Sequence, residues 1–151
     1  MKKSIIGCVF IVLPTFASAA YEPDKLKKFV TEAENIFKVI SWEQTENGVA
    51  WIAKTKLKNV VLSIGKNNSG IISFLSSPTD ATDAMIRCVA FGHYGAQTKT
   101  ENQRVQLSNA VNSAVEGKPT SIKLNGIKFE VSAEEIGNVV SLSCQLTPNK
   151  N

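Results

Sequence analysis

The sequence predicts an α+β fold, in which an antiparallel sheet of about six or seven strands is covered by three helices. Apolar residues recur at helical spacing in three segments, and they alternate with polar residues in several others. Such alternation leaves each strand one apolar face, which is typical of antiparallel sheets with helices on one side. A length of 151 residues, with 43% hydrophobic and 20% charged residues, fits a single globular domain.

The N-terminus has the pattern of a secretory signal peptide. Two lysines precede an apolar run from Ile5 to Leu13, and a small-residue cleavage site ends at Ala19. The run is about nine residues, whereas a membrane-spanning helix needs roughly 20, so an N-terminal anchor is the weaker alternative. We expect cleavage before Ala20 or Tyr21. The expected organisation is a signal peptide at 1–19 and a single α+β domain at 20–151.

The expected compartment determines how the cysteines are interpreted. A short, lysine-led signal is typical of bacteria, so the mature chain is expected in the periplasm or outside the cell. Cleavage leaves two cysteines, Cys88 and Cys144, in an oxidising environment, and this combination predicts one disulfide. The bond would close a loop of about 56 residues and contribute roughly 4 kcal/mol to stability.

Three segments have the spacing of amphipathic helices. The first opens at Pro23 and continues to Ile40. The second follows the capping residue Ser77 and places Cys88 on its inner side. The third follows a capping-box pattern at 98–101 and ends before Gly117. Its predicted inner side consists of Leu107, Ala110, Val111 and Ala114.

Two Asn-Gly dipeptides predict hairpins. A type I′ turn at 125–126 would place Ile122 opposite Phe129 and Leu124 opposite Ile127. The other dipeptide, at 47–48, joins two strands that would place Trp42 opposite Ala53 and Trp51 opposite Gln44. Further strands are predicted at 59–64, 71–76 and 139–146.

The two halves of the chain are similar at an offset of 78 residues. Asn47-Gly48 then falls on Asn125-Gly126, and the apolar positions that follow also coincide. Each half is predicted as helix, strand, Asn-Gly turn, strand and strand. Two explanations stay open: an internal duplication into two helix-plus-hairpin halves, or chance recurrence of a common arrangement.

The residue inventory predicts neither catalysis nor a cofactor. His93 is the only histidine and both mature cysteines are expected to be oxidised, whereas structural zinc takes about four such ligands. No serine has a nucleophile-elbow context, and no glycine-rich loop has phosphate-binding spacing. The 17 basic and 13 acidic residues form no basic stripe, so we expect no nucleic-acid partner. No transmembrane segment is predicted in the mature chain.

Aromatic residues are the remaining candidates for a binding surface. Trp42 and Trp51 are predicted on one face of the first hairpin, and that face could be either core or an exposed recognition surface. The segment from Phe91 to Gly95 is aromatic and rich in glycine, and we expect it to form a loop, where binding residues concentrate. The predicted interaction surface consists of Trp42, Trp51, Phe91, His93 and Tyr94.

A secretory signal, a small α+β domain, one disulfide and no catalytic constellation together resemble the general type of bacterial periplasmic inhibitor and immunity proteins. The resemblance rests on no specific motif. It implies a non-enzymatic binding protein that docks on another protein of the cell envelope, such as a toxin or hydrolase, and blocks it. Two alternatives are a carrier of a small ligand or lipid, and a small secreted enzyme that uses His93.

Overall fold

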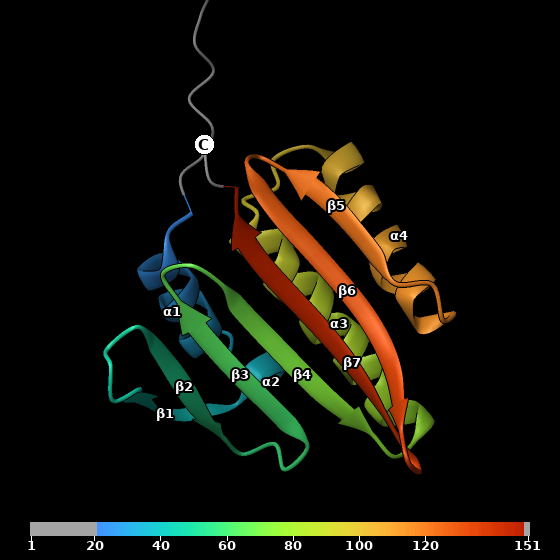
Figure 1. Cartoon of the computed structure of the whole chain (residues 1–151), viewed down its shortest axis with the longest axis horizontal. Coiled ribbons are helices and arrows are strands. Elements are labelled where there is room, and N and C mark those ends of the chain that lie inside the picture. The colour runs from blue at the N-terminus through green and yellow to red at the C-terminus, as the bar shows by residue number, and fades with distance from the viewer. Residues whose placement is uncertain (1–20, 150–151) are drawn as a thin grey trace, which may run out of the picture.

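The computed structural model describes residues 21–149, which form one antiparallel sheet of seven strands with helices on one face (Figure 1). The elements follow in the order α1 (Pro23–Glu32), α2 (Glu34–Phe37), β1 (Val39–Gln44), β2 (Ala50–Thr55), β3 (Val60–Gly65), β4 (Ser69–Leu75), α3 (Pro78–Gly95), α4 (Glu101–Val115), β5 (Thr120–Leu124), β6 (Ile127–Ile136) and β7 (Val139–Pro148). The strand order is β1-β2-β3-β4-β7-β6-β5. The predicted α+β fold is confirmed, whereas the predicted signal peptide lies outside the described residues.

The first helix is shorter than predicted. α1 ends at Glu32, a single turn of helix follows as α2, and Lys38 then adopts a left-handed backbone conformation with φ of 50°. Because that conformation cannot continue a right-handed helix, the chain turns into β1. The expectation that the helix includes Ile40 is therefore wrong, since Ile40 is an exposed residue of the edge strand β1.

α3 begins at the predicted capping residue Ser77, whereas the capping box of α4 lies two residues later than the predicted pattern at 98–101. The Ser77 hydroxyl accepts a hydrogen bond of 3.1 Å from the backbone N–H of Asp80. Thr100 and Gln103 form a reciprocal capping box at the start of α4. The four residues predicted on the inner side of the third helix are all buried in the structure, and α4 ends before Gly117 as predicted.

The predicted hairpin registers are confirmed. Trp42 pairs with Ala53 in β1–β2, and 78 residues further along Thr120 pairs with Val131 in β5–β6. Asn125 and Gly126 have φ of 50° and 78°, as a type I′ turn requires. The two halves therefore have the same element order and the same register in this hairpin. A duplication remains a hypothesis.

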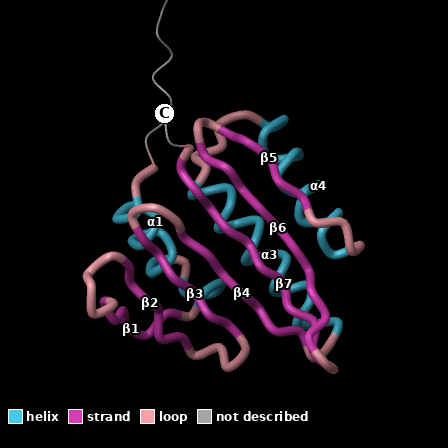
Figure 2. Tube along the Cα trace, viewed as in Figure 1, coloured by secondary structure: helices cyan, strands magenta, loops and turns pink. Residues whose placement is uncertain are grey.

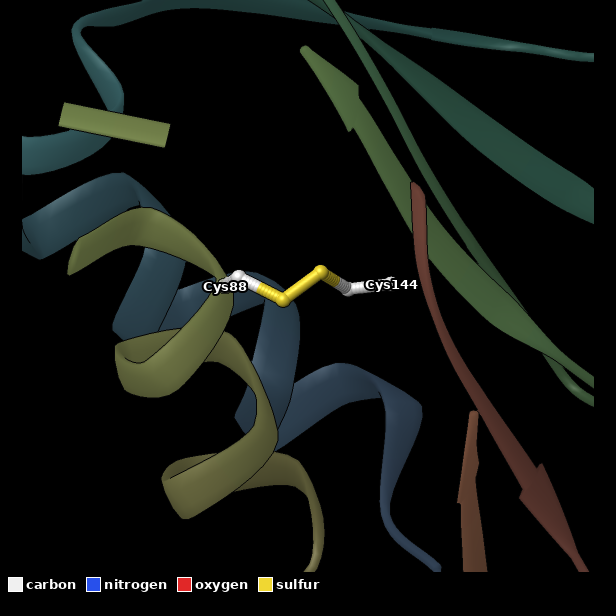
Figure 3. The surroundings of a disulfide bond; sticks show 2 residues. All are labelled: Cys88 and Cys144. Carbon is white, nitrogen blue, oxygen red and sulfur yellow. A yellow bond between two sulfur atoms is a disulfide. The ribbon is translucent and has the colours of Figure 1, made fainter. Parts of the chain in front are cut away.

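The core lies between the sheet and the helix layer (Figure 2). At its centre, Cys88 of α3 is bonded to Cys144 of β7, with 5.8 Å between the two Cα atoms (Figure 3). The bond links α3 of the helix layer to β7, the strand that pairs with β4. The predicted disulfide is thus present. No helix within residues 21–149 is both long and apolar enough to cross a membrane.

Candidate binding surfaces

The segment from Phe91 to Gly95 is the last turn of α3, so the prediction of a loop is wrong. Phe91 is fully buried and cannot belong to an interaction surface. A Cβ atom on Gly92 would lie 2.6 Å from the ring of Phe129, and one on Gly95 would overlap the side chain of Leu146. The two glycines therefore allow α3 to pack closely on β6 and β7, and they do not mark a flexible segment.

His93 and Tyr94 lie on the outer side of the same helical turn. The Nδ1 atom of His93 is hydrogen-bonded to the hydroxyl of Thr98, which is itself buried. Burial, and then the positive charge of Arg104, lower the pKa of His93 below its usual 6.5. The ring of Tyr94 stacks on that of Phe29 with 3.9 Å between centroids and an angle of 3°. These contacts support a local structural role for both residues.

A hollow of about 380 Å³ opens beside His93 and Tyr94. It lies between the start of α1 and the end of α3, and its lining includes three charged side chains, those of Glu22, Lys25 and Lys99. Lys25 and Glu22 form an ion pair of 2.7 Å. Such a lining suits a polar ligand. Thr98, whose hydroxyl is hydrogen-bonded to His93, is largely buried but lines the same hollow.

Trp42 and Trp51 lie on the sheet face that α1 covers. The indole N–H of Trp42 donates a hydrogen bond of 2.9 Å to the hydroxyl of Thr31, and Trp42 packs against the core. The ammonium group of Lys27 lies 4.4 Å from the Trp51 ring centroid, within cation–π distance. Both indoles are half-buried and serve in packing α1 on the first hairpin. The five predicted residues therefore do not form one surface.

The opposite face of the sheet is not covered by any of the described helices (Figure 1). Three large apolar side chains on it, Ile52, Val61 and Phe74, are 47%, 49% and 39% exposed. The pairing of the strands makes these side chains neighbours on the same face of the sheet. Val61 lies opposite Ile72, and Phe74 lies opposite Ser141, next but one to Val139. We call the diagonal series that results the outer-face row; it consists of Ile52, Val61, Ile72, Phe74, Val139 and Ile136.

Small and polar side chains surround the outer-face row. Ser63, Gly70 and Ser143 border a shallow groove of about 110 Å³ beside Val61 and Ile72. Sequence reasoning missed this surface, although one signal was available. Each of the dipeptides Val60-Val61 and Ile71-Ile72 places a β-branched residue on both faces of its strand, and so it breaks the alternation of a one-sided sheet.

Comparisons with known proteins found no relative. Neither the protein-family models, nor the curated proteins, nor the solved structures gave a match to this chain. Within the described part of the chain, no three His, Cys, Asp or Glu side chains are grouped so that they could hold a metal ion.

Proposed function

We propose that this chain is a non-enzymatic protein of the bacterial periplasm or exterior, and that it binds and blocks another protein of the cell envelope. The outer-face row is the observation that supports this proposal. Contiguous exposed apolar surface is uncommon on a monomer and is typical of interaction sites. An apolar strip surrounded by serine and glutamine side chains also has the composition of a protein interface, with an apolar centre and a polar rim.

The surroundings of the row indicate what the partner presents. Lys54 lies two residues from Ile52 on the same strand face and is exposed. Lys58 follows in the loop after β2 and is exposed, and one exposed carboxylate, that of Glu43, lies directly opposite Ile52. A partner with an apolar ridge bordered by acidic side chains would complement this end of the face.

A carrier of a small polar ligand is the second candidate. The hollow beside His93 and Tyr94 exceeds the roughly 300 Å³ of the smaller ligand sites in proteins. Its charged lining favours a polar molecule over a lipid. An enzyme that uses His93 is less well supported, because no carboxylate among the described residues is hydrogen-bonded to its ring to complete a catalytic triad.

The test compares one substitution on two faces. Val61→Glu changes the outer-face row, and Val105→Glu makes the same change on α4, where Val105 is 46% exposed. A partner is first captured from the native envelope fraction, identified and purified, and its affinity for each variant is then measured. We expect Val61→Glu to weaken binding about tenfold or more, and Val105→Glu and His93→Ala to leave binding unchanged.

Two results would contradict the proposal. Equal affinities of the Val61→Glu and Val105→Glu variants would show that the outer face does not bind the partner. Loss of activity in a folded His93→Ala variant alone would favour the enzyme alternative, since general acid–base catalysis contributes about 100-fold or more.

The proposed location has a separate test. If the chain is exported, the mature protein from the envelope fraction begins at Ala20 or Tyr21. N-terminal sequencing measures this directly. A mature envelope protein that still begins at Met1 would instead support the anchor alternative.

A further inference from the structure

The buried side chain of Arg87 makes no ion pair among the described residues. Arg87 lies on α3 and is only 5% exposed, and its Nε atom has no hydrogen-bond partner within residues 21–149. The other arginine of the sequence, Arg104, is exposed and lies 3.6 Å from the carboxylate of Glu101. Buried arginines are normally paired, because removal of a charge from water is costly.

The side chain of Arg87 lines a cavity of about 140 Å³ between α2, the loop after β2 and α3. Asn35 and Lys38 line the same cavity, so an amide and a second cation lie beside the guanidinium. An adjoining hollow shares Asn35 and Lys38 and adds one cation, Lys56, and one carboxylate, Glu34. Around the guanidinium, the positive charges of Lys38 and Lys56 balance the negative charges of Asp83 and Glu34, so Arg87 itself supplies the excess positive charge of the site.

Two acidic residues act on Arg87 without pairing with it. Asp83 lies one helical turn earlier and lines the cavity, and Asp80 lies further away. Burial lowers the pKa of Arg87, and the charges of Asp83 and Asp80 oppose this effect only in part. Neither carboxylate lies within ion-pair distance of the guanidinium in the described structure.

We propose that the Arg87 cavity is a binding site for a carboxylate group. A guanidinium can hold a carboxylate through two parallel N–H···O hydrogen bonds, and this geometry is specific to arginine. Lys38 and Asn35 would supply a second positive charge and an amide donor. A water molecule occupies about 30 Å³ of liquid, so a cavity of this volume admits a carboxylate with one or two waters. The carboxylate is either an acidic side chain of a protein or a small free acid. The inference does not depend on the outer-face row.

The test observes the Nε–Hε signal of Arg87 by NMR in the 15N-labelled mature protein. The Arg87→Met variant assigns the signal by its loss. The protein is titrated with sodium acetate, and with a capped pentapeptide that has one glutamate among glycines. Sodium chloride and the glutamine version of the peptide serve as controls at equal ionic strength. We expect the Arg87 signal to move in a saturable manner with an apparent affinity at least tenfold higher than that of the exposed Arg104.

The acetate titration and the peptide titration together distinguish the source of the carboxylate. A response to the glutamate peptide indicates an acidic side chain of a protein, and a response to acetate alone indicates a small free acid. Equal responses of Arg87 and Arg104, or equal effects of acetate and chloride, would overturn the proposal.

Two variants test whether Arg87 is instead a structural residue. If the guanidinium lacks a partner, the melting temperature of Arg87→Met without acetate should be no lower than that of the matched control Arg104→Met. Acetate should raise the melting temperature of the wild type and leave that of Arg87→Met unchanged. Asp83→Asn should leave the Arg87 signal near its original position. A displacement in Asp83→Asn as large as that caused by acetate would show that Asp83 is the partner, and would overturn the proposal.

Discussion

At the residue scale, His93 illustrates how a single polar side chain is adapted to the end of a helix. It lies two residues before the end of α3, and its hydrogen bond to Thr98 closes the turn that follows. The backbone N–H of Thr98 also donates to the carbonyl of His93 at 3.1 Å. Burial and the nearby charge of Arg104 disfavour the protonated ring, which lowers the pKa of His93.

This lowered pKa predicts a dependence of stability on pH. In the unfolded chain the ring takes up a proton near pH 6.5, whereas in the folded chain it does so only at lower pH. Protonation therefore favours the unfolded state, and the contribution of His93 to stability is complete above about pH 6.5 and decreases below it. His93→Asn retains a polar atom near the Nδ1 position and does not titrate. We expect its melting temperature to fall less between pH 7.5 and pH 5.0 than that of the wild type.

Scanning calorimetry at the two pH values measures the difference. Because the carboxylates are the same in both proteins, their effect cancels in the comparison. An equal fall in melting temperature would mean that the His93 ring is protonated as readily in the folded chain as in the unfolded chain.

The sequence predicted a loop from Phe91 to Gly95 with Phe91 on a surface, whereas these residues end α3 and Phe91 is buried. Glycine has two uses, conformational freedom and close approach of backbones, and an isolated Gly92-x-x-Gly95 pattern does not indicate which applies. The distinction depends on Phe129 and Leu146, which approach the glycines from strands far away in the sequence. The unpaired state of Arg87 likewise follows from its surroundings and could not be predicted.

At the element scale, the position of α3 on the sheet depends on those glycines. α3 is the helix that contacts both β4 and β7, the two central strands. An added methyl group at Gly95 would overlap Leu146, a fully buried residue of β7. A rigid core relieves such an overlap only by moving the helix or by changing side-chain rotamers.

We therefore predict that Gly95→Ala destabilises the protein. Alanine gains about 1 kcal/mol of helix propensity over glycine, and overpacking costs about 1–3 kcal/mol, so we expect a net loss of up to about 2 kcal/mol. Urea unfolding measures the change. Gly70→Ala is the matched control, because the nearest atom to a Cβ at that position lies at 3.5 Å, an ordinary contact. A Gly95→Ala variant more stable than the wild type would contradict the packing argument.

Local chemistry explains which elements were predicted correctly. Asn-Gly turns determine the hairpin register, and capping residues determine where helices begin, so the registers and the Ser77 cap were predicted from short stretches of sequence, and the cap of α4 was missed by two residues. The end of the first helix was not predicted, because α1 stops at Glu32 without a glycine and the left-handed residue that ends α2 is Lys38. The pairing of β4 with β7 was not predicted either, since about 70 residues separate these strands.

At the scale of the whole molecule, the β4–β7 pair connects two halves that are each built from local hairpins. β1 to β4 form one meander and β5 to β7 another, and the two meet only at this pair within the described sheet. The Cys88–Cys144 bond lies at the junction, where Cys144 is directly opposite Ile71 of β4. In the unfolded chain the cross-link therefore keeps the α3 and β7 segments close together. In the folded chain β7 is the strand through which the two halves of the sheet meet.

We predict that loss of this bond costs about 4 kcal/mol, because it closes a loop with a sequence separation of 56 residues. Cys88→Ala with Cys144→Ala removes both the bond and two buried sulfur atoms. Wild-type protein reduced by dithiothreitol keeps the sulfur atoms and loses only the bond, so it is the matched control. Urea unfolding of the three forms measures the stability of each and its dependence on urea concentration.

The control separates two explanations for the loss. If the bond acts on the unfolded chain, reduction alone should account for most of the loss, and the urea dependence should become steeper because the unfolded chain exposes more surface. If packing of the sulfur atoms dominates, the reduced protein should be nearly as stable as the oxidised one. Native protein whose two cysteines are both alkylated without reductant would show that the bond does not form.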